Sequence, residues 1–129
     1  MKKAGILNRH LSGALAVLGH TDLVVVCDAG LPIPDGPIVV DLAFRAGTPS
    51  FAEVFEGLLD ELVVEGAVAA EEIRGANPGA TALLDDRFPD LELVPHEEFK
   101  ALTRAARLVV RTGEARPYAN VILRCGVPF

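Results

Sequence analysis

The feature that most constrains the fold is an uninterrupted apolar run near the amino end of the chain, Leu23-Val24-Val25-Val26-Cys27. It is rich in β-branched residues, which favour strands, and it does not alternate with polar residues as a half-exposed strand does. A strand without alternation is covered on both of its faces, as strands of parallel sheets usually are. The run therefore predicts a sheet with other elements packed on each side.

The rest of the chain alternates between helical and strand patterns. Helices are predicted at residues 8–18, 48–62, 81–88 and 97–106. Further strands are predicted at residues 38–40, 63–70, 91–94, 108–110 and 120–124, and a turn at Asn77-Pro78-Gly79. Strands that alternate with helices are joined by β-α-β crossovers. We therefore expect an α/β fold: a single three-layer domain over residues 1–129, with a mostly parallel central sheet flanked by helices.

Two of the predicted helices begin with capping residues. Asn8 is a candidate cap for the first helix. For the second, either Thr48 is the cap and Pro49 takes the first helical position, or Ser50 and Glu53 form a capping box.

Composition limits the partners and the compartment. The 12 basic and 18 acidic residues give a net charge of −6, which argues against nucleic acid because its phosphates need a basic surface. No apolar run approaches the roughly 20 residues of a membrane-spanning helix, and Asn8, Arg9 and His10 interrupt the start too early for a signal peptide. Cys27 and Cys125 form neither a disulfide framework nor a CxxC motif. We expect a soluble, cytoplasmic protein, although a mean hydropathy of +0.35 is high for so short a chain.

In parallel sheets, ligands bind outside the carboxyl ends of the strands. Asp28 stands at this end of the first predicted strand, and His20 lies just ahead of the strand. Imidazole changes its protonation near neutral pH, so the pair is a candidate for acid–base chemistry. The alternative is structural, with His20 at the end of a helix and Asp28 in a turn.

Two more groups are candidate ligand contacts. His96 and Lys100 are four residues apart, which places them on one face of a helix that follows a strand. Tyr118 and Asn120 are two residues apart and face the same side of an extended segment, where a hydroxyl and an amide suit a polyhydroxylated ligand. Each group also has a structural reading, as a helix start and as an ordinary loop.

Other polar features suggest less chemistry. Glu71 and Glu72 are adjacent, so on a strand they face opposite ways, and a surface or interface role is favoured. Neither phosphate-binding glycine motif is present. Metal binding through His20 and His96 has no ligand spacing to support it, and Cys27 is most simply a core residue.

Read together, several short segments resemble the D-ribose pyranase family, whose relatives include fucose mutarotase. The likeness runs from end to end and is weakest over residues 75–90. The segments that carry it are Lys2–Asn8, Leu18–Asp22, Asp28–Gly36, Gly47–Phe51, Ala70–Ile73, Pro95–Lys100, Val110–Glu114 and Pro117–Leu123.

The resemblance implies an enzyme that interconverts the pyranose and furanose forms of β-D-ribose without a metal or redox cofactor. It assigns the role of proton donor to His20. It assigns sugar binding to a set of other residues, with Lys100 as a further contact: Asp28, His96, Tyr118 and Asn120. We expect Asp28 either to orient His20 or to accept a hydrogen bond from a ribose hydroxyl.

The resemblance also implies assembly of identical subunits into rings, commonly decamers, with each site built across a subunit boundary. Obligate interfaces are more hydrophobic than ordinary surface, which would account for the high hydropathy. The terminal Gly126–Phe129 segment is a candidate interface element, and Tyr118 and Asn120 are candidates to reach a neighbour's site.

Two alternative functions remain open. The first is a mutarotase acting on fucose or a related sugar by the same proton chemistry. The second is a non-catalytic sugar-binding or assembly module of a sugar uptake system, which would bind ribose without accelerating ring exchange.

Overall fold

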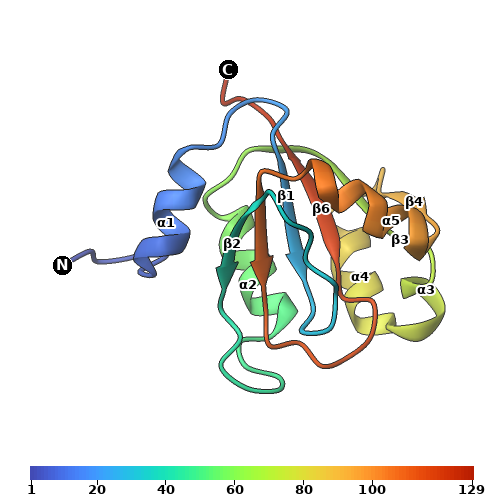
Figure 1. The fold of residues 1–129 in the computed structure, drawn as a ribbon. Coiled ribbons are helices and arrows are strands. Elements are labelled where there is room, and N and C mark those ends of the chain that lie inside the picture. Colours follow the sequence, from blue (N-terminus) through green and yellow to red (C-terminus); the bar gives the residue numbers. More distant parts are fainter.

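The computed structural model describes residues 1–129, and its helices and strands alternate along the chain as expected (Figure 1). The strands are β1 (Leu23–Cys27), β2 (Ile38–Asp41), β3 (Val64–Ala70), β4 (Glu92–Val94), β5 (Leu108–Arg111) and β6 (Val121–Cys125). The helices are α1 (Arg9–Ala16), α2 (Phe51–Leu59), α3 (Ile73–Ala76), α4 (Pro78–Arg87) and α5 (His96–Leu102), the last followed by a 3₁₀ turn at Thr103–Ala105.

All six strands form one sheet in the order β2-β5-β1-β6-β3-β4. β2, β5 and β1 are mutually parallel, and β3 is parallel to β4. β6 runs antiparallel to both of its neighbours, β1 and β3, and joins the two parallel groups. The prediction of a mostly parallel sheet is therefore confirmed, with β6 as the exception.

The β1 run is buried on both faces, as the sequence predicts. Val24 and Val26 pack into a core of 21 buried residues, to which α1, α2 and α4 contribute. Val25 and Cys27 point the other way, into a smaller core of 9 buried residues that includes Phe99 of α5. Figure 1 shows α5 on one side of the sheet and α2 with α4 on the other, so the three-layer arrangement is confirmed.

The helix starts follow local capping chemistry. The side chain of Asn8 accepts a hydrogen bond from the Leu11 N–H, and Ser50 rather than Thr48 caps α2 by accepting from the Glu53 N–H. The predicted turn at residues 77–79 is wrong, because Asn77 caps α4 there. Proline lacks an N–H and its fixed φ suits the first helical position, so Pro78 begins the helix instead of preventing it.

Two smaller differences concern the ends of elements. The helix predicted to continue to residue 106 tightens into the 3₁₀ turn after Leu102. The pairing of β3 with β6 shifts register between Val64 and Gly66, within the strand predicted at residues 63–70. None of the helices combines the length and the apolar character that crossing a membrane requires.

Candidate active site

A pocket of about 220 Å³ opens at the edge of the sheet where β1 and β4 end and β6 begins. Because β6 is antiparallel, the segment that precedes it lies at the same edge as the carboxyl end of β1. Four of the predicted site residues meet in this pocket although they come from three separate segments of the chain: Asp28, His96, Tyr118 and Asn120.

Asp28 and Asn120 form a buried pair, with 9% and 1% of their surfaces exposed. The Asn120 Oδ1 accepts from the Asp28 N–H at 2.8 Å, and the Asn120 Nδ2 donates to the Asp28 Oδ2 at 3.2 Å. The Asp28 Oδ1 accepts from the backbone N–H groups of Gly30 (3.0 Å) and Leu31 (2.9 Å). The carboxylate is thus held in one direction before any ligand arrives, which is the property a binding group needs.

His96 contributes an imidazole ring to the same pocket. The ring packs edge-on against Tyr118, with centroids 5.0 Å apart. Its Nδ1 is the one buried side-chain nitrogen or oxygen atom in the chain that has no hydrogen-bond partner. Because an unpaired buried polar atom is costly, its presence on a ring that lines the pocket favours a functional role for His96 over a purely structural one.

Glu72 fixes the start of the helix that carries His96. Both of its carboxylate oxygens accept from the His96 backbone N–H, at 3.1 and 3.0 Å. The favoured surface or interface role for Glu72 is therefore corrected: its carboxylate occupies the amino end of α5, where the free N–H groups of a helix attract negative charge.

Tyr118 has a φ of 57°, in the left-handed region that non-glycine residues rarely adopt. The turn is supported from α4, because the Asn77 Nδ2 donates to the carbonyl of Pro117 at 2.9 Å. Unusual backbone conformations cluster at binding sites, where they aim a side chain that a regular strand would direct elsewhere. The sequence gives no sign of this geometry.

His20 lies away from this pocket, beyond the other end of β1. The five residues of β1, at about 3.3 Å each, put about 17 Å of strand between the turn that carries His20 and Asp28, so Asp28 does not orient His20 of its own chain. The His20 side chain is 51% exposed, and its Nε2 lies 3.0 Å from the Glu65 Oε2.

The turn that carries His20 is held by Asp22. The Asp22 Oδ2 accepts from the Gly19 N–H at 2.7 Å and from the Arg107 Nη1 at 2.9 Å. These hydrogen bonds, the Gly19 bond foremost, keep the pKa of Asp22 below its ordinary value. His20 is therefore displayed to solvent on a defined turn.

Lys100 also lies outside the pocket lining. Its Nζ pairs with the Glu97 Oε1 at 2.8 Å, one turn back along α5, and this hydrogen bond lowers the pKa of Glu97. The spacing of four from His96 does place both residues on α5.

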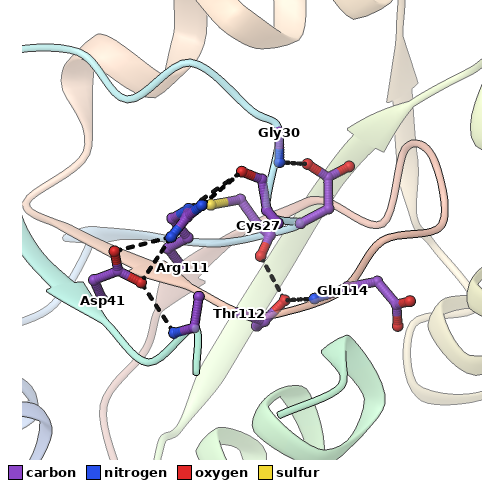
Figure 2. A network of polar contacts seen from close by, with 9 residues as sticks. Cys27, Gly30, Asp41, Arg111, Thr112 and Glu114 are labelled. Carbon is purple, nitrogen blue, oxygen red and sulfur yellow. Dashed lines mark hydrogen bonds and ion pairs between the residues drawn. The ribbon is translucent and has the colours of Figure 1, made fainter. Parts of the chain in front are cut away.

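Sequence reasoning missed a polar network beside the pocket (Figure 2). The Thr112 hydroxyl donates to the carbonyl of Cys27 at 2.8 Å and accepts from the Glu114 N–H at 3.1 Å. Arg111 bridges Asp41 and the carbonyl of Ala29. The available signal was that Arg111 and Asp41 directly follow predicted strands that end at this edge.

Two further features of the chain bear on its chemistry. Burial raises the pKa of the Cys27 thiol to about 12, which makes it a core residue rather than a nucleophile. No three His, Cys, Asp or Glu side chains are grouped so that they could hold a metal ion.

Comparison with known proteins agrees with this fold. The model of the RbsD / FucU transport protein family matches residues 1–128. The chain is 79% identical to D-ribose pyranase 2 of Streptomyces griseus subsp. griseus over the full length of both proteins. A structure of Bacillus subtilis RbsD complexed with D-ribose matches all of both chains at 49% identity and a TM-score of 0.94. A fucose mutarotase from Streptococcus pneumoniae, in complex with L-fucose, shares the fold at a TM-score of 0.84 and 19% identity, over all of both chains.

Proposed function

The chain belongs to the RbsD / FucU transport protein family, and on that premise we propose that it is a D-ribose pyranase. This isomerase interconverts β-D-ribopyranose and β-D-ribofuranose, with residues 1–129 acting as one domain. The observation that carries the proposal is the pocket in which Asp28, His96, Tyr118 and Asn120 converge from separate segments. The ribose-bound Bacillus subtilis relative and the relatives named D-ribose pyranase support ribose as the substrate.

The reaction is a proton rearrangement. The hemiacetal opens when the ring oxygen gains a proton and the anomeric hydroxyl loses one, and it recloses through a different hydroxyl. No oxidation state changes, so acid–base groups are sufficient and neither a metal nor a redox cofactor is required. General acid–base catalysis is typically worth roughly 10²–10⁴-fold, and a group that titrates near neutral pH serves it well.

We assign the proton transfer to His20, supplied to the pocket by a neighbouring copy of the chain. The separation of His20 from Asp28 along β1 supports this assignment, because no small rearrangement within one chain would bring them together. The exposure of the imidazole also supports it, since a group that serves another subunit must project from its own.

A homo-oligomer, for which we propose a decamer, would place sites at its subunit boundaries. Large apolar side chains that a single chain leaves exposed support such an assembly: Val17, Ile38, Val39, Phe44 and Phe129. Phe129 ends the candidate interface segment Gly126–Phe129 and is 98% exposed.

The pocket residues would hold the sugar by hydrogen bonds. The Asp28 carboxylate accepts from ribose hydroxyls, while the amide of Asn120, the phenol of Tyr118 and the imidazole of His96 offer further donors and acceptors. Lys100 would add a contact once it exchanges its pairing with Glu97 for a sugar hydroxyl. An uncharged polyol needs such directional partners more than it needs net charge.

The test is ring exchange measured by NMR saturation transfer on ribose and, in parallel, on fucose. We expect exchange between ribopyranose and ribofuranose to accelerate in proportion to enzyme concentration. Faster exchange of fucose alone would favour the related mutarotase activity. Saturable ribose binding without faster exchange would favour the non-catalytic binding module and contradict the proposal.

We also propose that the protein works in the cytoplasm. Its two cysteines are buried and unpaired, as is usual where thiols are kept reduced. Fractionation of cells that produce the protein would test this location.

A further inference from the structure

Arg111 ends β5 at the edge of the sheet where the pocket opens, and its guanidinium joins two segments far apart in the chain (Figure 2). Its Nη1 donates to both carboxylate oxygens of Asp41, at 3.1 and 2.9 Å. Its Nε and Nη2 donate to the carbonyl of Ala29, at 3.2 and 3.1 Å. Arg111 is in register with Asp41 on β2 and with Cys27 on β1, so the three side chains share one face of the sheet.

The peptide group between Ala29 and Gly30 is consequently held at both ends. Its carbonyl accepts from Arg111, and its N–H, which belongs to Gly30, donates to the Asp28 Oδ1 at 3.0 Å. A peptide group is planar and rigid, so fixing the direction of the carbonyl also fixes the direction of the N–H. A continuous chain of hydrogen bonds therefore runs from Asp41 through Arg111 and this peptide to the Asp28 carboxylate.

The peptide needs such a constraint because of the residue that follows it. Glycine accepts backbone conformations that other residues avoid, so the Ala29–Gly30 peptide can rotate at little cost when nothing holds its carbonyl. Rotation would take the Gly30 N–H away from the Asp28 Oδ1. The carboxylate would then keep the Leu31 N–H on that oxygen and the Asn120 Nδ2 on the other, and its direction in the pocket would be less tightly fixed.

We propose that Arg111 is a positioning residue of the sugar site and that Asp41 anchors it. Arg111 fixes the Ala29–Gly30 peptide and, through it, the direction in which the Asp28 carboxylate meets the sugar. This inference rests on the proposed function, because it takes Asp28 to be a sugar-binding group.

The chemistry of the side chain fits this role. A guanidinium is a planar fork that binds two partners in fixed directions, whereas a lysine ammonium is a point charge. The Arg111 and Asp41 side chains are 31% and 52% exposed, and ion pairs this exposed contribute little to stability. The Arg111–Asp41 ion pair therefore serves to fix the direction of the guanidinium rather than to stabilise the fold.

The first experiment compares Arg111→Met and Arg111→Lys with the intact protein in NMR exchange kinetics on ribose. Losing a hydrogen bond to a charged group corresponds to roughly a tenfold change in an equilibrium constant. We expect Arg111→Met to raise KM by about tenfold with little change in kcat, because the proton-transfer group is elsewhere. The KM of Arg111→Lys should lie between that of Arg111→Met and that of the unaltered protein. If the methionine variant does not fold, the lysine variant still tests the proposal.

Arg74→Met is the matched control. Arg74 also makes a two-pronged ion pair, with Asp85, but on α3 and α4 and outside the pocket lining. We expect its KM and kcat to equal those of the unaltered protein. An Arg111→Met variant with an unchanged KM, or one that loses kcat and thermal stability together with KM, overturns the proposal.

The second experiment tests whether Asp41 acts through Arg111. Asp41→Asn weakens the anchor and should raise KM by about threefold alone, and it should have no further effect in the Arg111→Met background. Additive effects would show that the two residues act separately and would contradict the proposal. The two proposals fail differently: an unaltered protein without exchange activity refutes the enzyme, whereas normal activity with an indifferent Arg111 refutes only the positioning role.

Discussion

Two kinds of site residue can be distinguished by how they are held. Asp28 and Asn120 are buried and bonded to one another, so their directions are set by the fold. His20 is half exposed and has a single side-chain partner, Glu65. The pocket residues are therefore preorganised within the chain, whereas the fold leaves His20 open to contact with a second surface, as the proposed function requires.

This difference leads to a prediction for His20→Ala. Exposed ion pairs contribute at most about 1 kcal/mol, so the variant should unfold within that margin of the unaltered protein. Its ribose exchange should slow by about 10²–10⁴-fold, the usual contribution of a general acid–base group. NMR saturation transfer and thermal unfolding measure the two effects.

The control is His10→Ala, which removes another exposed histidine and should leave ribose exchange unchanged. A His20→Ala variant with nearly normal ribose ring exchange would contradict the assignment of proton transfer to His20.

Single residues also show where sequence reasoning stops. Asp28 was identifiable because an acidic residue directly follows an unmistakable strand, and the other pocket residues stood out as polar groups near predicted strands. Only the family resemblance implies that these residues act together, because their convergence depends on β6 running antiparallel, which the strand pattern does not encode. The role of Arg111 could not be predicted, because its hydrogen bonds go to a backbone carbonyl and a carboxylate that are distant in sequence.

At the scale of elements, the loop after β5 is pressed against the segment that leads into α2. The Gly113 N–H donates to the carbonyl of Pro49, and the Gly47 N–H donates to the carbonyl of Gly113. A Cβ at position 113 would overlap the carbonyl oxygen of Thr48 and would lie 2.6 Å from that of Arg45. These are backbone atoms, so they do not move aside as a flexible side chain would.

Gly113→Ala should therefore destabilise the protein by about 2 kcal/mol or more, since overpacking in a well-packed site costs about 1–3 kcal/mol. Gly57→Ala is the matched control, because Gly57 lies within α2 and a Cβ there meets nothing within 4 Å. Alanine is the better helix former, so this variant should gain up to about 1 kcal/mol. Urea unfolding at fixed protein concentration measures both, and equal effects of the two substitutions would contradict the close approach at Gly113.

Most elements were predictable because their signals are local. Asn8 and Ser50 cap the helices that the sequence suggested, and the β1 strand has the predicted bounds. The turn predicted at Asn77-Pro78-Gly79 is wrong because the same residue types favour both a turn and the start of a helix. Only packing against the rest of the molecule decides between those two outcomes.

At the scale of the whole molecule, the separation of His20 from the pocket makes a mixing experiment decisive. His20→Ala and Asp28→Asn are each expected to be inactive alone. When they are unfolded and reassembled together in equal amounts, about a quarter of the boundaries should combine an intact His20 with an intact pocket. Ring-exchange activity should reappear to that extent, and native mass spectrometry would verify that mixed assemblies form.

The control is the same treatment of each variant separately, which should restore no activity. Mixed assemblies that remain inactive would contradict a site shared between copies. An active monomer, detected by light scattering under assay conditions, would contradict it as well.

The central place of β6 also has a consequence for biosynthesis. Val121–Cys125 emerges from the ribosome after the other five strands of the sheet, and it is the only one of the six that bonds β1 on one side and β3 on the other. Until it is released, a nascent chain holds two separate ribbons, β2-β5-β1 and β3-β4, with no hydrogen bonds between them. Completion of the sheet therefore waits for Val121–Cys125, and a shortened product that lacks this strand cannot join the two ribbons.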